Sequence, residues 1–206
     1  GDHAFWRYNC MDVMVTLECA HALKKEAEEE GLWDFYIEYQ QRPFIHSARM
    51  EWYGVGIDLE KRKAASAELA GQIVEIQDRI NQRLGYVLNV NSPKQMNNLL
   101  YERMGLKVKK NRATTRPTAD KETLRNFAEQ TRDEVLIWIQ ELRQVKDLKG
   151  DIVDQPLGQT GRMHSHFKQG GTDSNRWSST KSILGTGTNL QNIPRNGIAR
   201  SLFIPM

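Results

Sequence analysis

Cysteine is scarce in this sequence, which holds only Cys10 and Cys19 among 206 residues. Two thiols are too few for a disulfide-built scaffold, and their spacing fits neither a redox pair nor a zinc knuckle. We therefore expect a protein of a reducing compartment such as the cytosol. Both thiols are predicted to be buried as small apolar groups.

Long hydrophobic runs are also missing. No stretch approaches 18 apolar residues, which excludes a membrane-spanning helix, and a mean hydropathy of −0.64 with 27% charged residues indicates a chain with much polar surface. The length suits one or two domains with a hydrophobic core. The first residues contain no initiator Met, basic leader or apolar signal core, and the last ones resemble a strand, so we expect a piece of a longer protein.

A strong net charge is absent too, since the total is +3, but the charge is unevenly placed. From residue 143 onward nine Lys and Arg face four acids, a net charge of +5, which leaves −2 for the rest. A second basic cluster, offset only by Glu102, consists of Arg103, Lys107, Lys109, Lys110, Arg112 and Arg116. Local positive fields attract polyanions, although a solvated basic surface has the same composition.

Apolar periodicity and end signals predict helices over residues 8–30, 32–41, 43–53, 59–84, 93–105, 119–130 and 133–153. The clearest start is Ser92-Pro93-Lys94-Gln95, which combines a capping Ser, a first-turn Pro and a capping-box Gln. Helices 59–84 and 133–153 should pack antiparallel as an arm around a basic loop at 106–117. The predicted seam comprises Ile73, Ile76, Ile80, Trp138, Leu142 and Val145.

Beyond a boundary near Gln155 the residue composition and the apolar pattern change. Residues 161–167 and 198–204 are predicted strands, and Gly, Ser, Thr and Asn dominate 170–188. The fold class is therefore mainly α (α+β), a long antiparallel helix pair with a small β-containing C-terminal part.

Two side-chain pairs could bind metal. Tyr8 and Asp12 share a helix face, so Asp12 could hold a divalent ion while Tyr8 orients its water, but phosphodiester hydrolysis needs several carboxylates and an ordinary helix face is the alternative. His164 and His166 lie on one face of a predicted strand, yet no thiol or carboxylate is near them. Backbone contact with nucleic acid or a structural role suits them better.

The C-terminal part supplies polar donors at 161–164, 175–179 and 188–195. Its Arg, Gln, Asn, Ser and Thr side chains suit phosphate oxygens and the acceptors of the DNA minor groove. A plain polar loop is the alternative reading of this segment.

Here the motifs become recognisable. Asn-Leu-Gln-Asn-Ile-Pro at 189–194, preceded by Arg-x-Ser-Ser at 176–179 and Gly-Arg-x-His at 161–164, resembles the middle of a family A DNA polymerase, the family of bacterial DNA polymerase I and many phage polymerases. Residues 91–95 resemble the entry to its thumb, residues 50–58 the thumb's base, and Arg143 with Leu148-Lys149 the end of the long thumb helix. Residues 8–12 resemble the third exonuclease motif.

The resemblance implies a fragment of a DNA-directed DNA polymerase, a nucleotidyltransferase that uses magnesium. Residues 1–31 would be the C-terminal helix of a 3'-5' exonuclease-like domain, 32–155 the thumb and 156–206 the start of the palm. The palm carboxylates would lie beyond residue 206, so the fragment alone is expected to be inactive and to hold no cofactor. Asp12 would bind metal only in the complete exonuclease site. The long loop 181–188 is phage-like, which implies the cytoplasm of a bacterium or an infected host.

The family's DNA contacts carry over to particular residues. Those implied to lie near phosphates are Asn91, Ser92, Lys94 and Lys149; those implied to touch the minor groove near the primer end are Arg176, Gln191 and Asn192, with Arg195 as a backbone contact. The implied partners are primer-template DNA and the rest of the polymerase chain, with no membrane. One departure is Ser174-Asn175-Arg176 where the family has Thr-Gly-Arg. Alternatives are a non-enzymatic helical DNA-binding or protein-interaction module related to polymerase thumbs, and a nuclease built on Tyr8 and Asp12, which a lone carboxylate disfavours.

Overall fold

The computed structural model describes residues 2–111, 114–170, 172, 174, 176–195 and 197–205. The predicted fold class is confirmed, because long helices dominate and the strands form small antiparallel sheets. Within the described part of the chain, no helix is both long and apolar enough to cross a bilayer.

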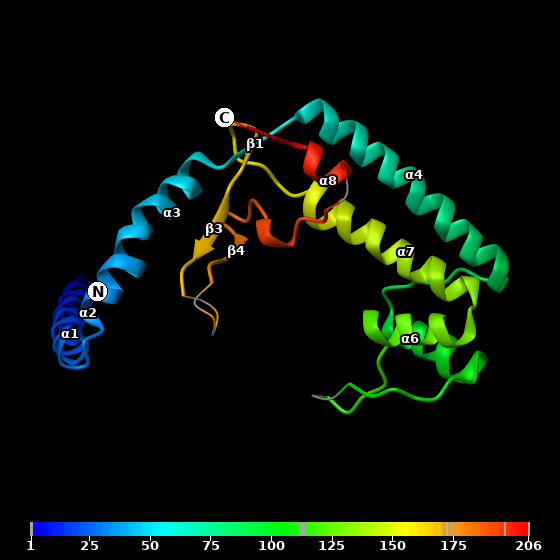
Figure 1. Cartoon of the computed structure of the whole chain (residues 1–206), viewed down its shortest axis with the longest axis horizontal. Helices are drawn as coiled ribbons and strands as arrows, with labels where there is room; N and C mark the ends of the chain where they lie inside the picture. Colours follow the sequence, from blue (N-terminus) through cyan, green and yellow to red (C-terminus); the bar gives the residue numbers. More distant parts are fainter. Residues whose placement is uncertain are drawn as a thin grey trace.

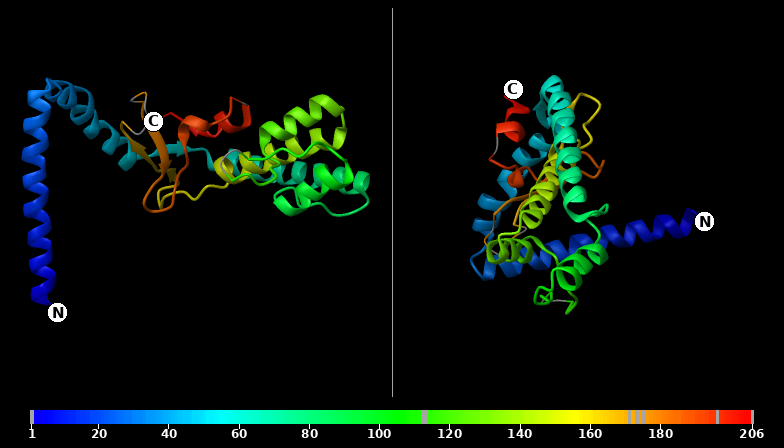
Figure 2. Two further views of the ribbon diagram at one scale, coloured as in Figure 1. Left: turned by 90° about the horizontal axis from the view of Figure 1, so that it is seen from below. Right: turned by 90° about the vertical axis from the view of Figure 1, so that its right-hand side faces the viewer.

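The N-terminal helix α1 (Asp2–Glu29) runs away from the rest of the molecule, as Figure 2 shows. It is followed by α2 (Trp33–Tyr36), the π-helical turn η1 (Ile37–Gln41) and α3 (Arg42–Tyr53). The prediction that both thiols are buried was wrong: Cys10 and Cys19 are exposed. The reason is that α1 packs mainly against α2 at its end, which leaves its length uncovered.

The predicted arm is present and spans residues 59–153 (Figure 1). Its two long helices, α4 (Leu59–Leu84) and α7 (Glu134–Leu148), lie antiparallel, and α7 continues into the π-helical segment η3 (Lys149–Val153). Asp58 caps α4 by accepting the Lys61 N–H at 3.0 Å. All six predicted seam residues belong to the arm's core: Ile76, Ile80 and Leu142 are buried, and Ile73, Trp138 and Val145 pack against them.

Shorter helices fill the far end of the arm. These are α5 (Pro93–Asn97), η2 (Asn98–Arg103) and α6 (Lys121–Thr131), so the helix predicted to reach Gly105 becomes π-helical from Asn98. The basic loop that follows η2 is anchored by Tyr101, whose hydroxyl accepts the Lys109 N–H at 3.3 Å and donates to the Thr118 carbonyl. Burial raises the pKa of this phenol, which keeps it a neutral donor.

Strands that precede and follow the arm in the sequence pair with one another at the base of the arm, which we call its root. Strand β1 (Val55–Ile57) precedes the arm and lies between β2 (Arg162–Met163) and β5 (Phe203–Ile204) in an antiparallel sheet of order β2-β1-β5. A second antiparallel pair joins β3 (Ser165–Lys168) to β4 (Ser178–Lys181). The strand predicted at 161–167 is therefore found as β2 and β3, on either side of His164.

The strand predicted at 198–204 was wrong over most of its length. Residues 197–201 form α8 (Gly197–Ser201), and only Phe203–Ile204 is extended. The helix wins because Ala199 and Leu202, three residues apart, are buried together against α4 and the end of the α7–η3 helix. In Figure 1 this segment sits between the two long helices at the root of the arm.

Helix α3 is fixed to β3 through Glu51. Its carboxylate accepts the Phe167 N–H at 2.6 Å and lies 2.9 Å from His166 Nδ1, while the Glu51 carbonyl lies 2.8 Å from His164 Nδ1. The two histidines thus face the same helix and serve to pack it. Among the described residues there is no group of three or more His, Cys, Asp or Glu that could hold a metal ion.

Candidate nucleic-acid interface

The first group of predicted DNA contacts lies at the far end of the arm. Ser92 caps α5 by accepting the Gln95 N–H at 3.4 Å, and Gln95 Oε1 in turn accepts the Asn89 N–H at 2.7 Å. The Asn89 carboxamide accepts the Asn91 N–H at 3.0 Å. This closed turn leaves the side chains of Asn91 and Lys94 exposed, so both can meet a ligand from a fixed backbone.

Arg143 holds that turn in place from inside the arm. Its guanidinium donates to the Val90 carbonyl from Nε at 3.0 Å and to the Ala119 carbonyl at 2.6 Å. Burial lowers the pKa of this guanidinium, although nearby carboxylates oppose the shift. Because an arginine stays charged in any case, these carbonyls supply the partners that a half-buried cation needs. Arg143 therefore holds the Asn91–Lys94 surface in place, and its guanidinium is engaged in hydrogen bonds inside the arm.

The second group lies just before β4 and on the 3-10 turn η4 (Leu190–Asn192). Ser179 is fully buried; its hydroxyl donates to Asn189 Oδ1 at 3.0 Å and accepts the Leu190 N–H at 2.9 Å. The same Asn189 oxygen accepts the Gln191 N–H at 3.1 Å, and the Gln191 carboxamide donates to the Trp177 carbonyl. Arg176, Gln191 and Asn192 are therefore held near one another with their side chains exposed.

Sequence reasoning missed the part that Ser179 plays. The Arg-x-Ser-Ser string names the residue, but only the antiparallel pairing of β4 with β3 shows that Ser179 points inward while its neighbours do not. The sequence itself carries no such signal, because Ser178, Ser179, Thr180 and Lys181 are all polar.

A cleft of about 560 Å³ separates η4 from the arm. Asn189, Asn192 and Pro194 line one side. The arm lines the other side with polar residues, Gln72, Lys121, Gln144, Asp147 and Asp151, and with apolar ones, Leu69, Val145, Leu148 and Ile152. Arg195 is exposed beyond Pro194.

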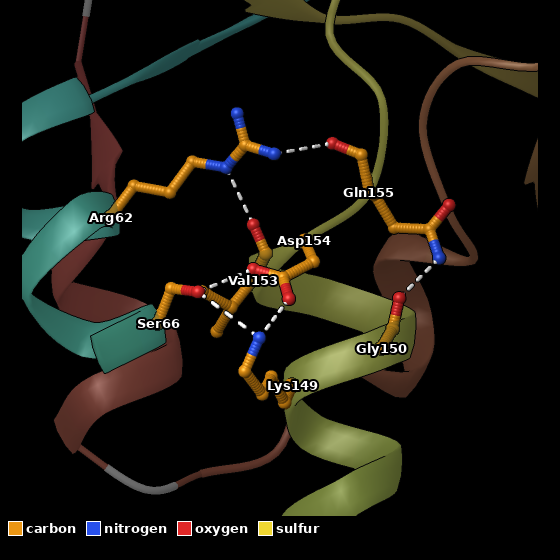
Figure 3. Close-up of polar contacts among 7 residues, drawn as sticks. All are labelled: Arg62, Ser66, Lys149, Gly150, Val153, Asp154 and Gln155. Carbon is orange, nitrogen blue, oxygen red and sulfur yellow. Dashed lines mark hydrogen bonds and ion pairs between the residues drawn. The ribbon is translucent and has the colours of Figure 1, made fainter. Parts of the chain in front are cut away.

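Lys149 lies elsewhere, in the network shown in Figure 3. Its ammonium contacts the Asp154 carboxylate and donates to Ser66 Oγ at 3.1 Å, and Ser66 donates to Asp154 Oδ1 at 2.8 Å. Beside it, Arg62 donates to the carbonyls of Val153 and Gln155. These residues border a second groove of about 530 Å³ that shares no lining residue with the first. The structure does not bring Lys149 together with the η4 residues.

Replacing Lys149 by methionine is expected to raise the pKa of Asp154 toward its ordinary value of 3.8. Burial alone would raise this pKa, but hydrogen bonds from Lys149 and Ser66 and the charges of Lys149 and Arg62 outweigh it and hold the pKa low. The pair's contribution to stability is thus present at neutral pH and lost as the pH falls through the lowered pKa. Since Asp154 is 40% exposed, the loss at pH 7 should stay below about 1 kcal/mol. Carboxyl NMR titration measures the shift; an unchanged Asp154 titration contradicts the assignment.

Tyr8 and Asp12 lie on the exposed length of α1, apart from both groups. Within the described residues Asp12 belongs to no cluster of metal-ligating side chains. A lone exposed carboxylate does not fit a magnesium site, because catalytic magnesium is shared by several oxygen ligands.

Comparison with known proteins identifies the family. The model of DNA polymerase family A matches residues 59–206, which is most of the chain. The chain belongs to DNA polymerase family A. It is 32% identical over 209 residues to DNA polymerase I of Synechocystis, covering 97% of this chain and 20% of that protein. To DNA polymerase I of Bacillus subtilis it is 29% identical over 176 residues, covering 84% and 19%.

Solved structures agree with the family. The POL domain of Pol1 from M. smegmatis, in complex with DNA primer-template and dNTP, matches with a TM-score of 0.75 and 28% identity over 90% of this chain and 32% of that chain. The chain is therefore part of the polymerase domain of a family A enzyme, and it spans about a fifth of the length of its polymerase relatives.

Proposed function

We propose that this chain grips the primer-template duplex in a DNA-directed DNA polymerase of replication or repair. In this proposal residues 1–31 are the last helix of an exonuclease-like domain, with Tyr8 and Asp12 as its third motif. Residues 32–155 are the thumb and 156–206 the start of the palm. The long turn after β4 marks a phage-type enzyme, and magnesium serves the parent enzyme's reaction.

The observation that carries the proposal is the arrangement of exposed donors on rigid supports. From residue 155 onward the sequence has six Lys and Arg and a single acid, Asp173. Within this basic segment the Ser179–Asn189 network and the bond from Gln191 to the Trp177 carbonyl hold Gln191 beside the backbone that follows Arg176. Amide and guanidinium donors match the N3 and O2 acceptors of the minor groove, which occupy similar places in all correct base pairs. Such contacts suit an enzyme that must hold every sequence.

Phosphate contacts come from the arm and its root. Asn91, Ser92 and Lys94 would meet the backbone at the far end, and Arg195 would do so near η4. Lys149 uses two of its three ammonium donors for Asp154 and Ser66. Its third N–H can still reach a phosphate, so the network orients Lys149 without consuming it. The polymerase domain solved with primer-template DNA supports this choice of ligand.

We expect the chain to bind duplex DNA weakly, with equal affinity for two unrelated sequences, and to lose affinity steeply as salt rises, because each phosphate contact releases condensed counterion. Fluorescence anisotropy over a salt series measures this. Lys94→Ala should make the slope of log affinity against log salt shallower by about one unit. Lys24→Ala on α1, which removes an equally charged side chain, is the control and should leave the slope unchanged. Strong preference for one sequence, or affinity indifferent to salt, would refute the proposal.

A further inference from the structure

The turn that joins β4 to η4 presents two aliphatic side chains to water. Ile183 is 98% exposed and Leu184 82% exposed. Ile183 is the most exposed large apolar side chain among the residues described. Burial of an aliphatic side chain that water surrounds is favourable, so these two neighbours can add to the affinity for a partner that covers them. Other exposed apolar neighbours, such as Trp52 and Tyr53, lie on helices, whereas this pair lies at the tip of a turn.

This tip is rigidly built. The Ser182 N–H donates to the Thr186 carbonyl at 2.8 Å, and the Gly185 N–H closes the turn on the Ser182 carbonyl at 2.9 Å. The Ser182 and Thr186 hydroxyls lie 2.9 Å apart, and Thr186 Oγ1 donates to the His164 carbonyl at 3.2 Å. The turn is thus fastened to the β3 side of the root. Because its backbone is already ordered, little conformational entropy remains to be lost when the tip meets a partner.

The surrounding charge indicates what the partner is. Lys181, exposed at the end of β4, directly precedes the turn, and residues 174–206 contain no acid at all. A cationic, acid-free segment favours a polyanion. The turn and Arg176 lie at opposite ends of β4, and η4 with Gln191 and Asn192 follows the turn in the chain. The tip and the donors proposed for the minor groove therefore belong to one segment, a strand's length apart.

We propose that Ile183 and Leu184 make an apolar contact with the sugars and base edges of the duplex minor groove, beside the polar contacts of β4 and η4. Aliphatic side chains are well suited to this groove, whose deoxyribose walls are apolar, and several DNA-binding proteins place Leu, Ile or Met there. The contact reads no sequence. This inference rests on the proposed DNA binding. It adds to that binding an apolar contribution to the affinity, which releases no counterion.

The test compares four variants of the whole chain by anisotropy with one labelled duplex. Ile183→Ser/Leu184→Ser should lower affinity about tenfold at every salt concentration and leave the salt slope unchanged, because the lost contact is apolar. Lys181→Ala should instead make the slope shallower. Ile183→Leu/Leu184→Ile keeps the apolar surface and should bind as the parent does. Val74→Ser, the same chemical change at a residue of α4 that is 60% exposed, is the matched control and should have no effect.

The outcomes separate this inference from the proposed function. If the parent chain does not bind DNA, the proposed function itself fails. If the parent binds with a steep salt slope and the double serine variant binds equally well, only the inference fails. Sedimentation in the absence of DNA tests the other occupant: self-association that the double serine variant abolishes, with DNA affinity unchanged, assigns the tip to a second copy and overturns the proposal. Far-UV circular dichroism establishes that each variant remains folded.

Discussion

Truncation of Leu142 to alanine is expected to lower the free energy of unfolding by about 2 to 5 kcal/mol. Leu142 is fully buried in the core between α4 and α7, together with Ile76, Ile80 and Ile139. The helices flanking the site are long and regular, so they cannot easily close over the space that the lost side chain leaves, and the cavity adds to the lost burial. Urea denaturation followed by circular dichroism measures the change.

Ile137→Ala on the same helix is the matched control. Ile137 is 49% exposed, so its truncation should change the free energy of unfolding by no more than about 0.5 kcal/mol. Equal losses at the two positions would show that the seam between α4 and α7 does not stabilise the arm.

Gly187→Ala should cost about 2 to 4 kcal/mol. Two effects combine here. The backbone of Gly187 has φ +79°, which side-chain-bearing residues rarely adopt, and an added Cβ would lie 2.1 Å from the His164 carbonyl oxygen. That oxygen belongs to backbone held between β2 and β3, so it cannot move aside cheaply. Thermal or urea denaturation gives the loss.

Gly185→Ala separates the two effects. Gly185 has nearly the same φ, +75°, but an added Cβ would meet nothing within 4 Å. Its replacement should therefore cost only the conformational strain, about 1 kcal/mol. A loss at Gly187 no larger than that at Gly185 would contradict the tight approach to His164.

The helices of the arm were predictable because their signals are local. Ser92 caps its helix in the structure as its sequence position indicates, and the apolar stripes of α4 and α7 place Ile80 and Leu142 in one core. Such features depend on residues three or four positions apart, which the sequence displays directly.

Features that depend on distant partners were not predictable. Residues 198–204 alternate well enough for a strand, but burial of Ala199 and Leu202 against the arm makes most of them helical. Cysteine is a residue type that is usually buried, but Cys10 and Cys19 lie on α1, which packs against little of the protein, and both are exposed. For the candidate interface, the motifs name Lys149 and Gln191, yet the partners that orient them, the Asp154 carboxylate and the Trp177 carbonyl, become visible only after the chain is folded.

The position of β1 has a consequence for the order of folding. The two long helices of the arm meet across the segment 85–133, whereas β1 pairs with β2 and β5 only across the whole of the arm. Closing so long a loop is slow, because its entropy is lost before the strand pairing compensates for it. The helix pair can therefore form first and bring the ends of its own sequence together, so that the root sheet forms last and, during native-state hydrogen exchange, opens before the arm does.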